Sequence, residues 1–172
     1  TGVGKTTLVR KMASLDFEDT SPTIGCTPEV MIRQNDRDLA LWDVGGNEKY
    51  KHSRSLYYND VDALMLVYDT TNLKTYYNLV KWMLEVYTAC KHTKAEFLRK
   101  VPTLIVGMKL DLAPKKDQPN KLQDDWKINA VYFGKTHTTD QIRDALRSFW
   151  SGETHQSGSE YVRRRRISDK YS

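Results

Sequence analysis

Short, uninterrupted apolar runs mark the middle of the chain. Residues 62–69 (Asp-Ala-Leu-Met-Leu-Val-Tyr-Asp) and 102–107 (Pro-Thr-Leu-Ile-Val-Gly) show no alternation of apolar and polar positions. Runs of this kind are typical of strands buried on both faces, as in a parallel sheet. The intervening segment, 75–91, carries apolar residues at helical spacing: Leu79, Trp82, Met83, Val86 and Tyr87. This order of strand, helix and strand predicts an α/β fold with a right-handed crossover.

The flanking segments continue this organisation. Residues 128–133 predict a further strand, and residues 139–150 predict a helix. The apolar stripe of that helix consists of Ile142, Ala145, Leu146, Phe149 and Trp150. Upstream, residues 29–33 and 39–43 flank the polar turn 34–38 and predict a β-hairpin. The pattern therefore favours one α/β domain with a mostly parallel sheet.

Length and composition narrow the class of protein. The 172 residues suffice for one compact domain, and no apolar run is long enough to cross a bilayer. The two cysteines, Cys26 and Cys90, are too few for a disulfide framework or a cysteine-based zinc site, which indicates a reducing compartment. The net charge is +5, and a run of arginines lies at 163–166. We expect a domain over residues 1–151 and a flexible basic tail over 152–172.

The chain opens inside a phosphate-binding motif. Its first residues, Thr-Gly-Val-Gly-Lys-Thr-Thr, match the end of G-x-x-x-x-G-K-[ST], whose leading glycine would precede Thr1. The glycines permit backbone angles that let successive N–H groups point at one phosphate. Lys5 would reach the β- and γ-phosphate oxygens, and the Thr6 hydroxyl would ligate Mg²⁺. The nucleotide-binding residues expected here are Gly2, Val3, Gly4, Lys5, Thr6 and Thr7. The alternative is an ordinary loop that leads into a helix.

Two later segments have the chemistry of a phosphate sensor. They read Pro22-Thr-Ile-Gly25 and Trp42-Asp-Val-Gly-Gly-Asn-Glu48. Asp43 would hold Mg²⁺, Gly46 would offer its N–H to the γ-phosphate, and Thr23 would complete the metal shell only while that phosphate is present. The predicted metal ligands are therefore Thr6, Thr23 and Asp43. The alternatives are a turn residue at Thr23 and a plain strand exit at Asp43 and Gly46.

These motifs, together with Tyr57-Tyr58 and Leu66-Val-Tyr-Asp-Thr-Thr-Asn72, resemble those of the Ras-superfamily small GTPases over about residues 1–150. Within that superfamily the sequence is similar to the Rab proteins, and it is most similar to the Rab-like-three subfamily. The resemblance implies a three-layer P-loop NTPase (small G-protein) domain whose first strand precedes Thr1. It further implies GTP and GDP binding with Mg²⁺, slow hydrolysis of GTP to GDP and phosphate, and effector and regulator proteins that bind the two switch segments. Self-association as a homodimer is a further implication.

The guanine site implied by the resemblance departs from the family pattern. The family's Asn-Lys-x-Asp reads Met108-Lys-Leu-Asp111 here. Asp111 would accept hydrogen bonds from the guanine N1–H and amine, and the stem of Lys109 would cover the base. Met108 can only pack, so we expect weakened affinity with guanine preference retained. The alternative for Lys109 and Asp111 is a solvated strand exit.

Other parts of the base site are also altered. We place Phe133-Gly134-Lys135 at the family's Ser-Ala-Lys loop, with the Gly134 N–H directed at the guanine O6 and Lys135 beside the base. Phe17 stands where the family packs an aromatic ring against guanine, or it is a core residue at a helix end. The segment between Asp111 and Gly134 is short for the family, so we expect a fourth helix of a turn or two near 120–127.

Asn47 occupies the position where most relatives carry the glutamine that orients the attacking water. Because asparagine is one methylene shorter, we expect very low intrinsic hydrolysis. The residues with expected catalytic roles are Asn47, Lys5 and Thr23. An alternative function is a pseudo-GTPase binding module with weak or constitutive nucleotide binding and no significant hydrolysis, which Met108 and Asn47 favour. Asn47 could also simply suit a glycine-rich turn.

The tail, residues 152–172, has no cysteine, so we expect no prenyl anchor. Three interpretations of its arginines stay open. The first is weak attraction to anionic lipid, which phosphorylation of Ser168 would cancel. The second is nuclear import, and the third is a merely solvated tail. We expect a cytoplasmic protein, with peripheral membrane attachment and a nuclear location left open. Specific nucleic-acid binding is not expected, because the arginines lack interleaved aromatic residues. A small-molecule P-loop kinase is a further alternative, but it would need an acceptor site and an arginine-rich lid, and neither is visible in the sequence before the tail.

Overall fold

The computed structural model describes residues 2–14, 23–24, 26, 30–34, 37–58, 61–113 and 118–151. Phe17 and the tail therefore lie outside the described residues. In chain order the elements are α1 (Lys5–Met12), β1 (Val30–Gln34), β2 (Arg37–Leu41), η1 (Glu48–Tyr50), α2 (Lys51–Ser55), η2 (Leu56–Tyr58), β3 (Leu64–Asp69), α3 (Leu73–Tyr77), α4 (Leu79–Ala89), α5 (Lys94–Lys100), β4 (Thr103–Met108), η3 (Leu110–Leu112), α6 (Lys121–Trp126), β5 (Asn129–Phe133) and α7 (Thr139–Ser151).

The described strands form two sheets. β3, β4 and β5 lie side by side in that order, all parallel, with Leu104 of β4 between Met65 and Asn129. β1 and β2 form an antiparallel hairpin, as the sequence pattern predicts. An isolated bridge between Cys26 and Val44 extends the antiparallel pairing beyond the hairpin.

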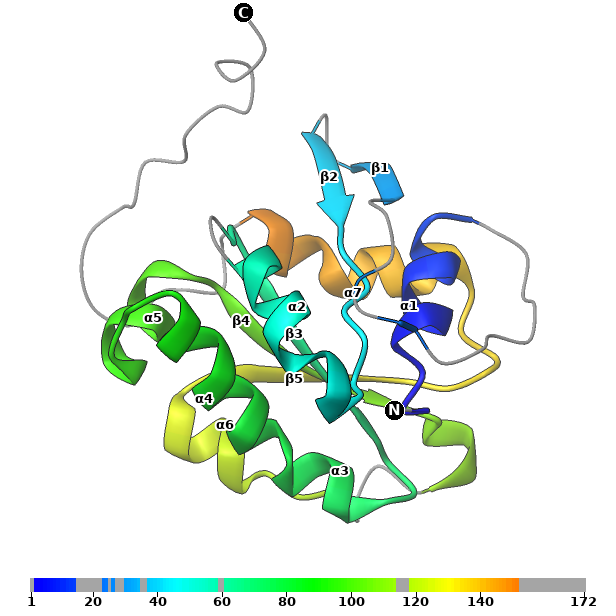
Figure 1. Ribbon diagram of the computed structural model, residues 1–172. Coiled ribbons are helices and arrows are strands. Elements are labelled where there is room, and N and C mark those ends of the chain that lie inside the picture. Colours follow the sequence, from blue (N-terminus) through cyan, green and yellow to red (C-terminus); the bar gives the residue numbers. More distant parts are fainter. Residues whose placement is uncertain are drawn as a thin grey trace, which may run out of the picture.

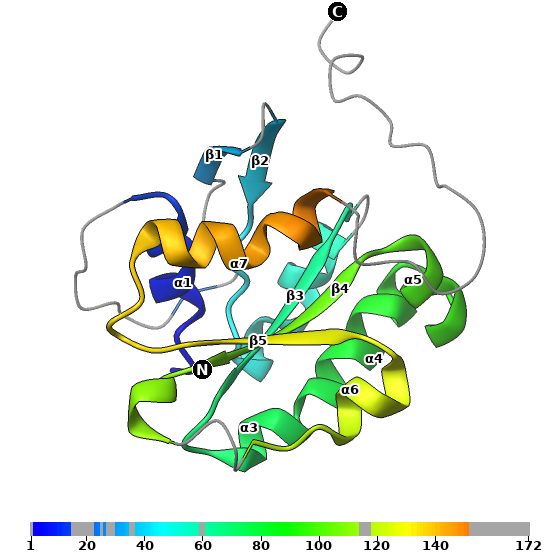
Figure 2. The same cartoon turned by 180° about the vertical axis from the view of Figure 1, so that it is seen from behind.

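Helices cover both faces of the parallel sheet, as Figures 1 and 2 show from opposite sides. α1 and α7 lie on one face, and α4 and α6 lie on the other. Alternate side chains of the fully buried strand β4 enter the two cores. Leu104, Val106 and Met108 pack with the first pair of helices, and Ile105 packs with α4 and its neighbours. The expected three-layer α/β architecture is confirmed.

The strand at 62–69 packs against both cores, as expected, but it is less completely buried than β4. In β3 the side chains of Leu64, Met65 and Val67 are only half-buried. Within the described residues β3 pairs with β4 alone, so it lies at an edge of the parallel sheet. An edge position leaves one flank of a strand uncovered. β4, which has a neighbour on each side, is buried along its whole length.

The helices of the structure differ in part from those that the sequence predicts. The helix expected over 75–91 is divided at Asn78 into α3 and α4, although Asn78 itself keeps helical angles. α5 was not predicted, and it begins with a capping box in which Thr93 and Glu96 bond each other's backbone N–H. The short helix near 120–127 is present as α6. In α7, Ala145 of the predicted stripe is exposed, because the buried stripe runs through Ile142, Leu146 and Phe149.

No helix among the described residues combines the length and apolar character that crossing a bilayer requires.

Candidate nucleotide-binding site

The start of α1 lies at the carboxyl end of β4, and two glycines there have backbone angles that other residues rarely adopt. Gly2 and Gly4 both have left-handed backbone angles, with φ of 75° and 96°. A Cβ on Gly4 would make ordinary contact, at 3.4–3.5 Å, with carbon atoms of Met108 at the end of β4, so the backbone angle and not the space favours glycine. The first helical bond runs from the Leu8 N–H to the Gly4 carbonyl. The preceding N–H groups of α1 therefore have no acceptor within the helix and form its positive end.

The three predicted metal ligands come together beside this helix end, although they are far apart in the sequence. Thr6 belongs to α1, Asp43 follows β2, and Thr23 lies in the segment between them. The Thr6 hydroxyl donates to Asp43 Oδ2. The Thr23 hydroxyl donates to the same oxygen over 3.1 Å, and the two hydroxyl oxygens lie 3.3 Å apart.

The other oxygen of Asp43 has no such contacts. Asp43 is 5% exposed, and its Oδ1 makes no hydrogen bond within the described part of the chain. A buried carboxylate oxygen without a partner is costly, so it is a natural ligand position for a cation. A carboxylate with two hydroxyls supplies the oxygen ligands that Mg²⁺ prefers, and Mg²⁺ usually completes its shell with phosphates and water. The residues present therefore fit a magnesium ion held together with a bound phosphate.

Lys5 is the only charged residue among the first seven, and it lies in a strongly desolvating environment. Burial lowers the pKa of its ammonium below 10.5, the nearby Asp43 opposes this, and the Arg54 guanidinium adds to it. An added phosphate would favour the charged form of Lys5. Of the other residues in this loop, Val3 is buried and Thr7 is half-buried.

The segment that follows Asp43 holds Asn47 in a local structure of its own. The side-chain oxygen of Asn47 accepts a hydrogen bond of 3.0 Å from the Lys49 N–H and so caps η1. Its backbone carbonyl accepts a hydrogen bond from Arg54 Nη1. Gly46, at the start of this segment, is half-buried. In this arrangement the side-chain oxygen of Asn47 is engaged in capping.

At the opposite end of the site, Met108 and Lys109 make contacts inside the protein. Met108 is 5% exposed and packs against Gly4, so an apolar contact braces the loop where the family has an amide. Lys109 has a left-handed φ of 66°, and its ammonium lies 2.5 Å from Asp69 Oδ2 at the end of β3. Burial alone would raise the pKa of Asp69, but hydrogen bonds from Lys109 and Thr71 hold it below its usual value.

The segment after β5 lies directly against Asp111. A Cβ on Gly134 would be 2.7 Å from Asp111 Oδ1 and 2.9 Å from the Asp111 backbone nitrogen, so only glycine fits there. Asp111 Oδ1 accepts a 2.8 Å hydrogen bond from the Lys135 N–H. The Gly134 N–H, which we expected to face the guanine O6, donates instead to His137 Nδ1 over 3.0 Å. Lys11 of α1 donates to the carbonyls of Lys135 and His137, which holds this turn in place.

Sequence reasoning missed the residue that anchors the Asn47 segment. Arg54 is fully buried and forms a two-pronged ion pair with Glu85 of α4. Its own surroundings in the sequence, Lys-His-Ser-Arg-Ser, give no signal. A signal exists at Glu85, which follows Trp82 by one helical turn on a partly buried face. An acidic residue in such a position requires a buried partner.

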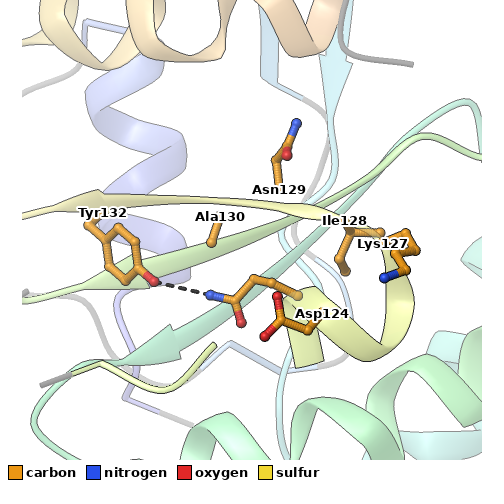
Figure 3. Close-up of a pocket in the computed structure, with 7 residues that line it drawn as sticks. Asp124, Lys127, Ile128, Asn129, Ala130 and Tyr132 are labelled. Atoms are coloured by element: carbon orange, nitrogen blue, oxygen red, sulfur yellow. Dashed lines mark hydrogen bonds between the residues drawn. The ribbon is translucent and has the colours of Figure 1, made fainter. Parts of the chain in front are cut away.

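The protein also has a surface hollow that is separate from this site. It has a volume of about 550 Å³ and lies between α6 and β5. Figure 3 shows Asp124, Lys127 and Tyr132 around it, with a hydrogen bond from the Gln123 amide to the Tyr132 hydroxyl. None of the predicted site residues lines this hollow. Among the described residues, no group of three or more His, Cys, Asp or Glu side chains could hold a metal by itself.

Comparison with known proteins matches the same region. A model of the Ras family matches residues 1–142. The chain is 33% identical over 141 residues to the Ras-related protein RABG1 of Arabidopsis thaliana, covering 77% of this chain and 68% of that protein. It is 31% identical over 139 residues to Rab-like protein 3 of Xenopus tropicalis, covering 66% and 59%. It is 31% identical over 149 residues to the Rho-related GTP-binding protein RhoF of Mus musculus, covering 84% and 67%.

The chain spans 59–68% of the length of these three relatives. A Rho-related protein matches at nearly the same identity as the Rab and Rab-like proteins, so the narrower likeness to the Rab-like-three subfamily stays a prediction. The superfamily resemblance drawn from the motifs is confirmed by the match that covers residues 1–142. The chain belongs to the Ras family, and it is similar to the Rab and Rab-like proteins within it.

Proposed function

We propose that this domain is a guanine-nucleotide-binding switch that binds GTP or GDP with Mg²⁺ and hydrolyses GTP slowly. The observation that carries the proposal is the meeting of Thr6, Thr23 and Asp43, which leaves Asp43 Oδ1 buried and without a partner among the described residues. Three separate segments of the chain contribute these oxygens, and a bound metal–phosphate unit explains why they converge. One relative, RhoF, is itself named a GTP-binding protein.

Each part of the site has a role in this proposal. Lys5 and the free N–H groups at the start of α1 bind the phosphates. Thr6, Thr23 and Asp43 would hold Mg²⁺, which when bound neutralises phosphate charge. Lys109, Asp111, Gly134 and Lys135 would surround the base; in the structure Gly134 and Lys135 already lie against Asp111. Since Thr23 reaches Asp43 from a separate segment of the chain, its engagement by metal and γ-phosphate is the step that would make the domain a switch.

Slow hydrolysis follows from the position of Asn47. Its side-chain oxygen caps η1, and orienting a water would require it to leave the Lys49 N–H. The same observation favours the second candidate, a pseudo-GTPase that binds nucleotide without significant hydrolysis. The two candidates differ in a single rate, the release of phosphate from bound GTP.

A surface for partner proteins lies next to these segments. The large apolar side chains of Ile24, Trp42, Leu56 and Tyr57 are 44–74% exposed, and the rings of Trp42 and Tyr57 lie 5.4 Å apart. Exposed apolar groups of this kind mark protein-binding sites. We propose that effectors and regulators bind these side chains, because Ile24 and Trp42 adjoin Thr23 and Asp43 in the sequence and would move with them when nucleotide is exchanged.

The test is calorimetric titration of the folded protein with GDP, a non-hydrolysable GTP analogue and ATP, each with and without Mg²⁺. We expect both guanine nucleotides to bind more tightly with Mg²⁺, and ATP to bind more weakly than the GTP analogue. Absence of guanine-nucleotide binding by a protein with an intact circular-dichroism spectrum would contradict the proposal. Single-turnover phosphate release then separates the candidates, and Asn47→Gln is the matched variant: a faster rate supports the GTPase, whereas no release from either protein supports the pseudo-GTPase.

A further inference from the structure

A fully buried arginine connects the segment after Asp43 to the helix layer. Arg54 of α2 is 0% exposed, which is rare for arginine unless its charge is paired. Its Nε and Nη2 donate to the two oxygens of Glu85 over 2.7 and 2.8 Å. The Arg54 Cζ atom lies 4.5 Å from the centre of the Trp82 ring, so α4 supplies both the counter-charge and an aromatic face.

The third guanidinium nitrogen of Arg54 bonds a residue outside α4. Arg54 Nη1 donates to the backbone carbonyl of Asn47. One rigid, planar group therefore bonds Glu85 through two nitrogens and Asn47 through the third, whereas lysine has a single nitrogen with which to reach the same three oxygens. Arg54 also lies close enough to the phosphate-binding lysine that its charge contributes to lowering the pKa of Lys5, after the larger effect of burial.

The environment of Glu85 shows that the pair is built as a fixed unit. The Tyr58 hydroxyl donates to Glu85 Oε1 over 2.9 Å, on the same oxygen as Arg54 Nε. Burial by itself would raise the pKa of Glu85, but the hydrogen bonds from Arg54 and Tyr58 hold it below its usual value. Glu85 is thus a charged acceptor in this structure, and its position on α4 is independent of the Asn47 segment.

We propose that Arg54 is a positioning residue, which ties the Asn47 carbonyl to Glu85 and so fixes the segment 46–49 beside the phosphate site. The inference rests on the proposed function, because the terminal phosphate is the group that this segment would face. The competing explanation is that Arg54 only holds α2 against α4. The two explanations differ when the ion pair with Glu85 is kept but the hydrogen bond to the Asn47 carbonyl is lost. The backbone of residues 46–49 loosens only if Arg54 positions it.

Arg54→Lys makes that change, since one ammonium keeps the charge beside Glu85 but lacks the planar fork. We expect amide hydrogen exchange of residues 46–49 to accelerate about 10- to 100-fold, the range that loss of one charge-assisted hydrogen bond sets. Exchange within α4 and β4 should stay unchanged. Tyr58→Phe is the buried matched control, because it removes a donor to Glu85 without touching Asn47. Lys81→Ala breaks the exposed ion pair between α4 and Glu48, a second tether of the same segment, and should accelerate exchange at 46–49 less than Arg54→Lys does, because a surface ion pair contributes little.

Unchanged exchange at 46–49 in Arg54→Lys, or equal acceleration in Tyr58→Phe, would overturn the proposal. So would acceleration of α4 and β4 to the same degree, which would show general loosening. If Arg54→Lys does not fold, Glu85→Gln provides the test: it keeps the shape of the acceptor and weakens its hold on the fork. A smaller acceleration confined to 46–49 supports the proposal, and none overturns it.

A nucleotide experiment adds a readout that a purely structural role does not move. Arg54→Lys should lower the affinity for the non-hydrolysable GTP analogue relative to GDP, while the affinity for GDP with Mg²⁺ stays within about twofold of the unmodified chain. An equal loss for both nucleotides would contradict the positioning role. If the unmodified protein binds neither nucleotide, the proposed function fails, but the exchange experiment still decides the role of Arg54.

Discussion

The phosphate end and the base end of the candidate site differ in how far their polar groups are already paired. At the phosphate end, Asp43 Oδ1 is buried without a partner in the described residues, and burial disfavours the charge on Lys5. At the base end, Asp111 accepts from the Lys135 N–H, and the Gly134 N–H donates to His137. The first end has groups that a ligand would stabilise, whereas the second has groups that bond one another.

This difference has an energetic consequence. A ligand that pairs a buried, uncompensated charge removes a desolvation penalty as well as forming a bond. A base that bonds Asp111 or Gly134 mostly exchanges one hydrogen bond for another, and such exchanges have small net free energies. We therefore expect affinity to come chiefly from the phosphates and the metal, and base selectivity to be modest.

The largest effect should come from Lys5→Ala. Loss of the ammonium removes charge-assisted hydrogen bonds to phosphate, and we expect the affinity for GDP and for a GTP analogue to fall about 100-fold or more by calorimetry. Lys121→Ala, an exposed lysine on α6, is the control and should change neither affinity. If Lys5→Ala costs no more than a substitution at Asp111, the two ends do not differ as proposed.

Asp43→Asn should weaken ligand binding without destabilising the nucleotide-free protein. We expect the Mg²⁺-dependent part of GDP affinity to fall about tenfold or more, because the carboxylate is the charged member of the oxygen cluster. The melting temperature of the nucleotide-free protein should not fall, since the change removes a buried charge with an unpaired oxygen. Thermal unfolding with and without Mg²⁺ and GDP measures both. A lower melting temperature in the absence of ligand would mean that Asp43 is a structural residue.

The phosphate end was also the part that the sequence could predict. Its residues lie in short motifs whose spacing is fixed by the chemistry of one phosphate, so Lys5, Thr6 and Asp43 could be identified from the string alone. The order of helices and strands was predictable for a similar reason. β4 is a continuous apolar run, and α7 has apolar residues at helical spacing. These are signals that local sequence contains.

The features that were missed depend on contacts that the apolar pattern of the sequence does not reveal. The partial exposure of β3 follows from its having one neighbour among the described strands, which no residue within β3 reveals. Arg54 bonds Glu85 across 31 positions, and His137 takes the Gly134 N–H only because the turn after β5 closes tightly. α5 was missed although Thr93 and Glu96 mark its start, because it has few apolar residues to give a period. Pairing partners of polar side chains are the information that a sequence pattern does not contain.

The pH dependence of binding provides a separate measure of the phosphate end. Because the pKa of Lys5 is lowered from 10.5, the free protein loses this proton at a lower pH than an ordinary lysine would. Bound phosphate restores the charge, so affinity should fall by up to about tenfold per pH unit above the lowered pKa and stay level below it. Titration in buffers of different ionisation enthalpy should show proton uptake in that range. Lys5→Arg, which stays charged, should show no slope.

The lowered pKa of Lys5 also determines how the free energy of unfolding depends on pH. A folded-state pKa below the unfolded value means that the charged lysine disfavours the fold at low and neutral pH, and that this penalty fades as pH rises toward 10.5. We therefore expect the nucleotide-free protein with Lys5→Met to unfold at a higher temperature than the unmodified chain at pH 7. Equal melting temperatures would contradict the assignment of Lys5 as a desolvated cation.

At the base end, Asp111→Ala should cost much less than Lys5→Ala. Asp111 is exposed, so its hydrogen bonds to a base replace bonds to water, and we expect the affinity for GDP to fall only about 2- to 10-fold. The preference for GDP over ADP should shrink by the same factor. A loss near that of Lys5→Ala would show that the base end contributes as strongly as the phosphate end.

The smallest and most specific effect concerns His137→Ala. In this structure a base O6 would have to compete with His137 Nδ1 for the Gly134 N–H. Removing the imidazole frees that donor, and we expect the affinity for GDP to rise about two- to fivefold. The diphosphate of 2-aminopurine riboside, which lacks O6, is the matched ligand and should gain nothing. An equal gain for both ligands would trace the effect to a rearranged turn rather than to the freed N–H. No gain for either would mean that the Gly134 N–H does not face the base.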